Sequence, residues 1–256
     1  MQVRPIKTHR VSPGESVESI LDKHLPRLSE RTIVVITSKI VSLCQNRIVP
    51  KQEVLDKKDL VLKEADAYLD EEESSRRYGI YLTLKNKILI PTAGIDESNA
   101  NDAYILYPEN IPETVNQIWA YLKKRDGLSE IGVVLSDSHT THLRRGVTGV
   151  GLGWCGFFPL HNYIGEPDLF GKPLRVSMSN LLDGIASAAV LVMGEGSEQT
   201  PICLVEQLDK IQFQDRPPTP EELSLITIEP QEDIYEPILK HARWVRKLIV
   251  LHKETL

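Results

Sequence analysis

The stretch SDSHTTHLRRG, residues 136–146, places an aspartate, two histidines, several hydroxyl groups and two arginines directly after an apolar run. Asp137 follows the run 131–135, and a strand ending there would fix the backbone while the side chain meets solvent. Arg144 and Arg145 can bind an oxyanion such as phosphate through paired hydrogen bonds. Two kinds of chemistry are therefore open: a transition-metal site built on the histidines, or a phosphate site with its magnesium ion.

Two further acids stand in similar surroundings. Asp96, in ILIPTAGIDESN, follows an apolar segment, and Glu195, in MGEG, follows a run of small and apolar residues. A single acid in such a place is more often a helix cap or part of a turn. Three acids at the ends of elements favour a hard-cation site, because oxygen ligands select magnesium or manganese over zinc.

The histidines suggest zinc as the alternative. His139 and His142 lie three residues apart and could chelate zinc from a helix, with His161 as a candidate third ligand. Histidines in a polar loop are more often surface groups or groups that support a ligand. The sequence therefore favours the magnesium or manganese interpretation.

A literal GxGxxG motif is present at Gly151, Gly153 and Gly156. The dinucleotide-binding fingerprint needs a following helix and an acid about 20 residues further on. Here a proline follows three residues later and no acid lies near position 176. The glycines are better explained by close packing of the backbone beside a site.

The distribution of apolar residues predicts a mixed α/β (α+β) fold rather than a doubly wound Rossmann fold, because strands and helices alternate without a strict βαβ rhythm. Residues 64–79 are expected to form a solvated insertion or a short helix. Helices are expected over residues 12–25, 111–127 and 181–196. Strands are expected over residues 31–43, 85–91, 129–138, 172–180 and 201–208.

A boundary is expected near the turn QDRPPTP, residues 214–220, so that residues 1–212 form the core and residues 213–256 a helical segment packed on it. Within the core, two intertwined subdomains are an alternative. Apolar residues at helical spacing from Ile234 to Ile249 predict an amphipathic helix with a basic outer face. Packing on the core or on a twin subunit is favoured over contact with a membrane or an acidic partner.

The composition is that of an ordinary globular protein, with 256 residues, 41% hydrophobic and 26% charged side chains. A net charge of −6 argues against non-specific nucleic-acid binding. The longest apolar stretch, residues 185–193, is too short to span a membrane. Three distant cysteines, and no apolar segment after the basic N-terminus, favour a cytoplasmic location.

Several motifs in this order resemble the coenzyme F-420 gamma-glutamyl ligase family: TSKIVS, AGIDESN, SDSHTTHLRRGVTG, NYIGEPDLFGKPLRV and LLDGIASAAVLVMGEG. The resemblance covers most of the chain, from about residue 30 to about residue 205. It implies a mixed α/β fold particular to that family, and a homodimer. It also implies GTP-dependent addition of L-glutamate to a deazaflavin coenzyme precursor, with divalent metal ions.

The resemblance also implies roles for individual residues. Asp96 and Asp137 would hold one metal ion, and Ser138 (usually threonine in the family) and Glu195 would belong to a second. The predicted nucleotide-binding residues are Ser38, Asn99, Gly194 and Gly196. The predicted catalytic residues are Arg144, Arg145 and Asp183. The expected cofactors are two magnesium or manganese ions, with GTP or ATP as cosubstrate and potassium as a further candidate.

The sequence departs from the family pattern in two places. SLCQNR replaces the usual SKAEGR, so that Leu43 stands where a nucleotide-contacting lysine is usual, and HTTHL replaces an asparagine–glycine stretch. These features resemble a divergent branch described as folate-metabolism gamma-glutamate ligases. We therefore expect a ligase that adds L-glutamate to a coenzyme-like carboxylate through an acyl phosphate. The alternatives are a non-catalytic nucleotide- or coenzyme-binding homologue and a metal-dependent phosphohydrolase.

Overall fold

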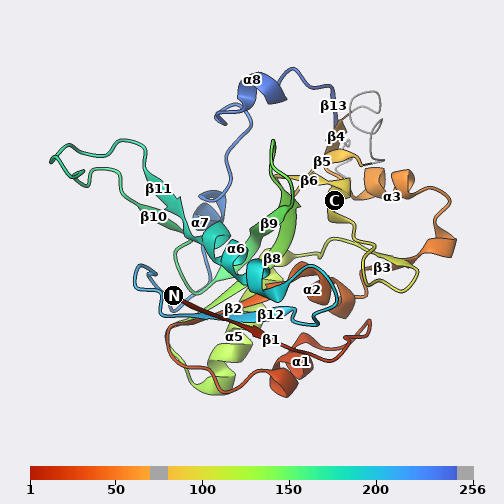
Figure 1. Cartoon of the computed structure of the whole chain (residues 1–256), viewed down its shortest axis with the longest axis horizontal. Helices are drawn as coiled ribbons and strands as arrows, with labels where there is room; N and C mark the ends of the chain where they lie inside the picture. Colours follow the sequence, from red (N-terminus) through yellow and green to blue (C-terminus); the bar gives the residue numbers. More distant parts are fainter. Residues whose placement is uncertain (70–79, 247–256) are drawn as a thin grey trace, which may run out of the picture. The chain divides into compact units, whose positions relative to one another are not determined.

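Figure 1 shows a computed structural model of the chain, which describes residues 1–69 and 80–246. The chain forms two compact units, Met1–Ile48 with Pro108–Thr227 and Val49–Tyr107 with Ile228–Leu256. The units are interleaved along the chain. Helices and strands occur in both units, which confirms the mixed α/β class. Within the described residues, no helix is both long enough and apolar enough to cross a bilayer.

A five-stranded sheet forms the centre of the first unit. Its order is β1–β12–β2–β8–β9, and only β2 and β8 run parallel to each other. The bounds are Gln2–Ile6 (β1), Ile202–Glu206 (β12), Thr32–Thr37 (β2), Ile131–Thr140 (β8) and Val147–Cys155 (β9). β2 and the first part of β8 are buried, so their sequences are continuously apolar rather than alternating. One parallel pair among antiparallel strands excludes a Rossmann fold, as the sequence predicted.

Helices cover both faces of this sheet. α6 (Leu181–Met193) packs against β1, β8, β9 and β12, and its apolar side chains join a buried cluster that includes Val134. α5 (Ile111–Asp126) packs against β8 and β9. α5 begins with a proline in its first turn and ends at Gly127, whose φ of 72° and N–H bond to Lys123 close the helix. The sequence predicted both helices.

The glycine-rich motif lies in β9, and its glycines allow close packing on both helices. A bulge at Leu152 separates the pairs Leu135–Gly153 and Ser136–Gly151. The extra residue turns Gly151 toward Leu182 of α6 and Gly153 toward Ile111 of α5, where an added Cβ would collide with either side chain. The structure therefore supports the packing interpretation of GxGxxG.

The prediction of one strand over residues 31–43 is wrong in its second half. β2 ends at Thr37, and residues Ser38–Cys44 form the helix α2. Ile40 and Val41 are buried as expected, but they belong to a helix rather than to a strand. A short apolar run does not distinguish the two, because either element can bury it completely. The remaining helix on this side, α1 (Val17–His24), is capped by Ser16 as expected for its serine-containing start.

Short elements make up the rest of the first unit. They are β10 (Leu160–Asn162), which pairs with β11 (Met178–Asn180), and α7 (Pro220–Ser224). β11 is shorter than the strand predicted over residues 172–180. α7 begins with a capping box, in which Thr219 and Glu222 each accept from the other's backbone N–H.

The second unit has two small sheets. The order of the larger is β13–β4–β5–β6, and β3 pairs with β7 in the other. The bounds are Trp244–Arg246 (β13), Ala67–Leu69 (β4), Leu82–Lys85 (β5), Ile88–Pro91 (β6), Ile48–Pro50 (β3) and Ala103–Ile105 (β7). Its helices are α3 (Lys57–Glu64) and the short 3₁₀ turns η1 (Lys51–Glu53) and η2 (Thr92–Gly94). A buried cluster around Val61 and Ile95 forms its core.

The prediction of one long C-terminal helix is wrong for the described residues. After a single helical turn, α8 (Glu236–Leu239), the chain enters β13, where Trp244 pairs with Leu69 of β4. Ile234 and Ile238 are exposed, so the apolar stripe of the expected helix is not buried in this chain. The helical spacing is a local signal, whereas the open edge of β4 is a distant partner that spacing cannot reveal. Residues 247–256, and most of the predicted insertion 64–79, lie outside the described residues.

Candidate functional site

Four chain segments meet at one edge of the first unit's sheet, which we call the carboxyl edge. Parallel strands β2 and β8 reach it together, because Thr37 pairs with Ser136. β12 enters there, with Ile202 paired to Ile36 and the N–H of Thr37 bonded to Pro201. β1 leaves there, and the N–H of Thr8 donates to the carbonyl of Gln199 (2.9 Å). In open α/β sheets, ligands commonly bind where strands of this kind end.

Asp137 and Ser138 reach the carboxyl edge within β8. The strand predicted over residues 129–138 runs from Ile131 to Thr140, with Asp137 opposite Val150 and Ser138 opposite Gly149. Asp137 is half-buried, and its Oδ1 accepts a hydrogen bond from the N–H of Ser138 (2.8 Å). Because the first six residues of β8 are buried, the strand fixes the backbone that carries Asp137 and Ser138.

The arginines lie beyond this strand end, on the exposed turn between β8 and β9. Neither Arg144 nor Arg145 forms an ion pair with a carboxylate of residues 1–69 or 80–246. The turn also exposes Leu143 completely, and Gly146 has a φ of 92° that favours glycine. The surface salt bridge that is the ordinary role of such arginines is therefore absent from the described part of the chain.

His139 is half-buried and His142 is exposed. Burial lowers the pKa of His139, which the nearby carboxylate of Asp183 partly opposes. Both histidines follow the extended chain around the hairpin rather than a helix, so the helical spacing that suggested zinc does not occur.

Glu195 follows α6 on an exposed turn that also leads to the carboxyl edge. The turn closes on Glu198, whose Oε2 accepts from the N–H of Gly196 (2.8 Å). Gly194 has a φ of 80°, and an added Cβ would collide with the same carboxylate. The two predicted nucleotide-binding glycines thus shape a turn around Glu198, a residue that the sequence analysis did not select.

Asp183 lies in the first turn of α6 and links this helix to β9. Its Oδ1 accepts from the N–H of Gly151 (2.9 Å), and its Oδ2 accepts from the side-chain amide of Asn180 (2.6 Å). These contacts describe a residue that holds β9 against the helix start. They leave its predicted catalytic role a prediction.

Ser38, the first residue of α2, is buried directly after β2 at the carboxyl edge. Asp96 and Asn99 belong to the second unit. Asp96 exchanges two backbone hydrogen bonds of 2.9 Å with Ile105, and its Oδ1 accepts from the N–H of Ser98 (2.6 Å). Asn99 is exposed with a φ of 54°.

The predicted metal ligands therefore come from both units, Asp96 from the second and Asp137, Ser138 and Glu195 from the first. In the parts of the chain that the structure describes, no group of three or more His, Cys, Asp or Glu side chains could hold a metal ion. The chemistry of the predicted donors, three carboxylates and a hydroxyl, fits magnesium or manganese.

A chain of charged hydrogen bonds at the same edge was missed by the sequence analysis. His9 Nδ1 lies 2.7 Å from His24 Nε2, and His9 Nε2 lies 2.8 Å from Glu15 Oε2. The ring of His24 also bonds to the backbone of Lys7, and burial lowers the pKa of His24. The backbone N–H of His9 also donates to His24 Nε2 (3.4 Å). The spacing of the three residues carries no pattern that could have predicted them.

Comparison with known protein families identifies the family to which the sequence belongs. A model of the family described as F420-0:gamma-glutamyl ligase matches residues 5–207. The chain belongs to this family.

Among the relatives of this γ-glutamyl ligase family member are proteins named coenzyme F420:L-glutamate ligase. That of Methanosarcina barkeri is 29% identical over 215 residues, covering 78% of this chain and 82% of the relative. That of Methanosarcina mazei is 30% identical over 212 residues, covering 78% and 82%. That of Methanopyrus kandleri is 27% identical over 222 residues, covering 81% and 87%. The predicted family resemblance is thus confirmed.

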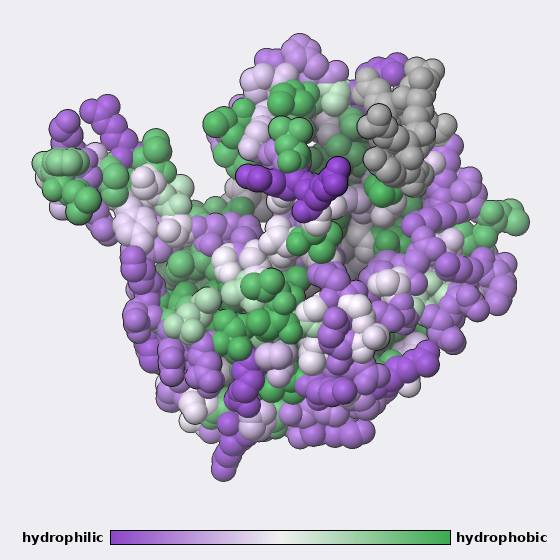
Figure 2. Space-filling view, in the orientation of Figure 1, coloured by the Kyte–Doolittle hydropathy of each residue, from purple (hydrophilic) through white to green (hydrophobic). Residues whose placement is uncertain are grey.

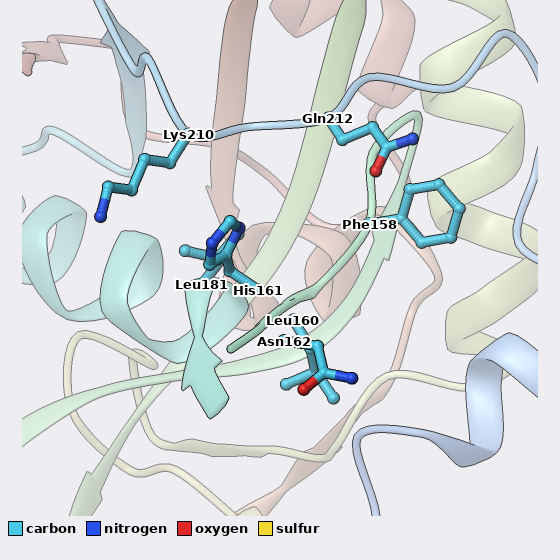
Figure 3. Close-up of a pocket in the computed structure, with 7 residues that line it drawn as sticks. All are labelled: Phe158, Leu160, His161, Asn162, Leu181, Lys210 and Gln212. Atoms are coloured by element: carbon cyan, nitrogen blue, oxygen red, sulfur yellow. The ribbon is translucent and has the colours of Figure 1, made fainter. Parts of the chain in front are cut away.

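All predicted site residues of this family member lie within the matched range 5–207. Figure 3 shows a cavity of about 320 Å³ that is lined partly by residues after the matched range. It is lined by Phe158, Leu160, His161, Asn162, Leu181, Lys210 and Gln212. Most of these residues follow the ends of β9 and β12, and Leu181 is the first residue of α6. None of the predicted magnesium or manganese ligands, nucleotide-binding residues or catalytic residues lines this cavity.

Proposed function

We propose that the chain is a nucleotide-dependent ligase that joins L-glutamate through an amide bond to a carboxylate of a coenzyme-like acceptor. Membership of the γ-glutamyl ligase family and relatives named for F420 and L-glutamate support the reaction class. The observation that supports the proposal is that β2 and β8 end side by side, so that Ser38 follows one strand where Asp137 and Ser138 lie on the other.

Amide formation from a carboxylate in water needs activation, which the γ-phosphoryl group of GTP or ATP provides. An acceptor carboxylate oxygen attacks the γ-phosphorus, the bond to the bridging β–γ oxygen breaks, and the nucleoside diphosphate leaves. The neutral amine of L-glutamate then attacks the acyl carbon, phosphate leaves, and the amine loses a proton. Positioning and charge neutralisation dominate catalysis of such phosphoryl transfers.

Within the first unit, Asp137, Ser138 and Glu195 would hold the magnesium or manganese ions. Bound there, these ions neutralise phosphate charge and polarise the reacting oxygens. Arg144 and Arg145 would bind the transferring phosphoryl group, because their guanidinium groups lack a carboxylate partner among the described residues. Ser38, with the backbone of the Gly194–Gly196 turn, would bind the nucleotide.

The proposed enzyme is a homodimer. The long loop between β10 and β11 extends away from the first unit's sheet (Figure 1) and exposes apolar side chains, which appear beside hydrophilic ones in Figure 2. Leu169 is 100% exposed, Phe170 87% and Val176 83%. Large apolar side chains gathered on one projecting loop favour burial against another protein surface, and a twin subunit supplies one.

The function is tested by incubating the purified protein with manganese, GTP or ATP, L-glutamate and a small-molecule extract. The proposal predicts nucleoside diphosphate release that depends on L-glutamate, and a metabolite heavier by one glutamyl unit in the mass spectrum. Phosphate release without L-glutamate would instead indicate a phosphohydrolase. Nucleotide binding without turnover under all conditions would indicate a non-catalytic homologue, for which Leu43 in place of lysine provides a reason.

A further inference from the structure

Two lysines of the second unit converge on a single carboxylate. Lys51 of η1 places its Nζ 2.8 Å from Oε2 of Glu97, and Lys57 of α3 contacts Oε1 of the same group. Both ammonium groups also lie over the ring of Tyr104, at 5.3 and 5.9 Å from its centroid. Three different elements thus present two cations and an aromatic face around one anion.

The charges of this cluster do not balance within it. Lys51 and Lys57 carry two positive charges and Glu97 one negative charge. Asp102 is the other acid that acts on Lys51, and its effect is smaller than that of Glu97. The side chains of Lys51, Lys57 and Glu97 are 40%, 31% and 37% exposed, so solvent ions reach them.

We propose that Lys51, Lys57 and Tyr104 form an oxyanion-binding site for a phosphate or carboxylate group, which Glu97 fills when no ligand is bound. The carboxylate of Glu97 marks the position and orientation that an incoming oxyanion takes, with one oxygen on each ammonium. A phosphate offers the same pair of oxygens and a larger charge, so it can displace the side chain. The aromatic ring holds both lysines in place when the anion is exchanged.

The site is adjacent to a predicted metal ligand, because Glu97 directly follows Asp96. The backbone of Asp96 is fixed by its two hydrogen bonds to Ile105, so Glu97 can swing away while Asp96 stays in position. Anion binding would therefore open the surface beside Asp96 without unfolding its loop. This inference does not depend on the ligase reaction, since it concerns only the two lysines and an oxyanion.

Glu97→Gln tests the site, because the amide keeps the shape of the side chain and removes its charge. Inorganic phosphate is titrated into the full chain at constant ionic strength, with the NMR signals of the lysine side chains as the readout. Glu97→Gln is expected to bind phosphate at least about fivefold more tightly than the wild type. Lys51→Met in the Glu97→Gln background, which keeps the apolar stem, should abolish the gain.

Glu229→Gln is the matched control, because Glu229 pairs with the single lysine Lys87 at 2.9 Å. It should leave phosphate affinity unchanged. L-glutamate in place of phosphate distinguishes the two sources of oxyanion, and lysine-dependent binding of either probe supports the site. The proposal is overturned if Glu97→Gln binds both probes no better than Glu229→Gln, or if the gain survives Lys51→Met. Glu97→Ala provides the same comparison if the glutamine variant does not fold.

Discussion

The two units hold their candidate metal ligands by different means. Asp137 lies in β8, a strand whose first six residues are buried and which is paired on both sides. Asp96 lies in a loop, and two backbone hydrogen bonds join it to Ile105. The next residue, Glu97, belongs to the charged cluster with Lys51 and Lys57. The first arrangement depends on apolar burial, which salt hardly affects, and the second depends partly on exposed charges, which salt screens. The difference suggests a rigid platform in one unit and an adjustable loop in the other.

The largest effect is expected from filling the close contact between β9 and α6. In Gly149→Ala the new Cβ would collide with the backbone of Ala186, and we expect a loss of about 2–3 kcal/mol in the free energy of unfolding. Chemical denaturation measures it. Gly184→Ala is the control, because Gly184 of α6 faces open space and the change should stabilise the helix by up to about 1 kcal/mol. Equal effects would mean that the platform is not tightly packed.

Arg145→Ala is expected to weaken nucleotide binding by more than tenfold, about 1.4 kcal/mol. Its guanidinium has no carboxylate partner among the described residues, so it is available for an anion. Arg27→Ala, which removes an arginine whose side chain is 82% exposed, is the control and should change affinity little. Calorimetric titration measures both. A loss for Arg145→Ala as small as that of the control would assign Arg145 to the ordinary surface.

A pH-dependent loss of stability should arise from the first unit's histidine network. Burial, followed by the charge of His9, lowers the pKa of His24 from its ordinary 6.5, so the unfolded chain binds this proton more readily. Stability contributed by neutral His24 is present above pH 6.5 and is lost as the pH falls below it. The pKa of Glu15 is lowered from 4.5, so the stability that its carboxylate contributes is present above pH 4.5 and does not change between pH 7.5 and pH 5.5.

Unfolding curves of wild type and His24→Gln at pH 7.5 and pH 5.5 measure this effect. The variant should lose less stability between the two values than the wild type does. His139 is shifted in the same direction by burial and remains in both proteins, so it cancels in the comparison. An identical pH dependence would show that His24 is not held neutral.

The smallest expected effect is that of salt on hydrogen exchange, which compares the Asp96 loop of one unit with the Asp137 strand of the other. Raising the salt concentration from 0.1 to 1 M shortens the screening length from about 10 to about 3 Å. We expect hydrogen exchange at the Ser98 amide to become about two- to fivefold faster, because the neighbouring Glu97 cluster weakens. The Ser138 amide beside Asp137 should exchange at an unchanged rate. Equal acceleration at both amides would remove the distinction.

The sequence predicted those elements that a long local pattern of apolar residues or a helix cap identifies. The runs around β8 and β12, and the capped helices α5 and α6, are found where expected. It did not predict α2, since a short apolar run fits helix and strand alike, nor β13, since strand pairing depends on a distant partner. The motif order indicated the family, and the family model confirms it.

The candidate site shows the same limit. Ser38, Asp137 and Ser138 could each be selected by a motif, but their adjacency follows from the parallel pairing of β2 with β8, which no local spacing contains. His9, Glu15 and His24 were missed for the same reason, because their contacts arise from the folded loop before α1. Glu198 was overlooked because the neighbouring Glu195 matched the motif.

The central claim is that Asp137 at the carboxyl edge helps to bind a metal ion that carries a nucleotide. Calorimetry of GTP binding in the presence and absence of manganese, with wild type and Asp137→Asn, tests it most directly. Asparagine keeps the acceptor oxygen for the Ser138 N–H, so the fold should be preserved. The account predicts that manganese-dependent binding weakens by about 100-fold or more, or about 2.7 kcal/mol, at unchanged unfolding free energy. Binding as tight as that of the wild type, with the same dependence on manganese, would contradict it.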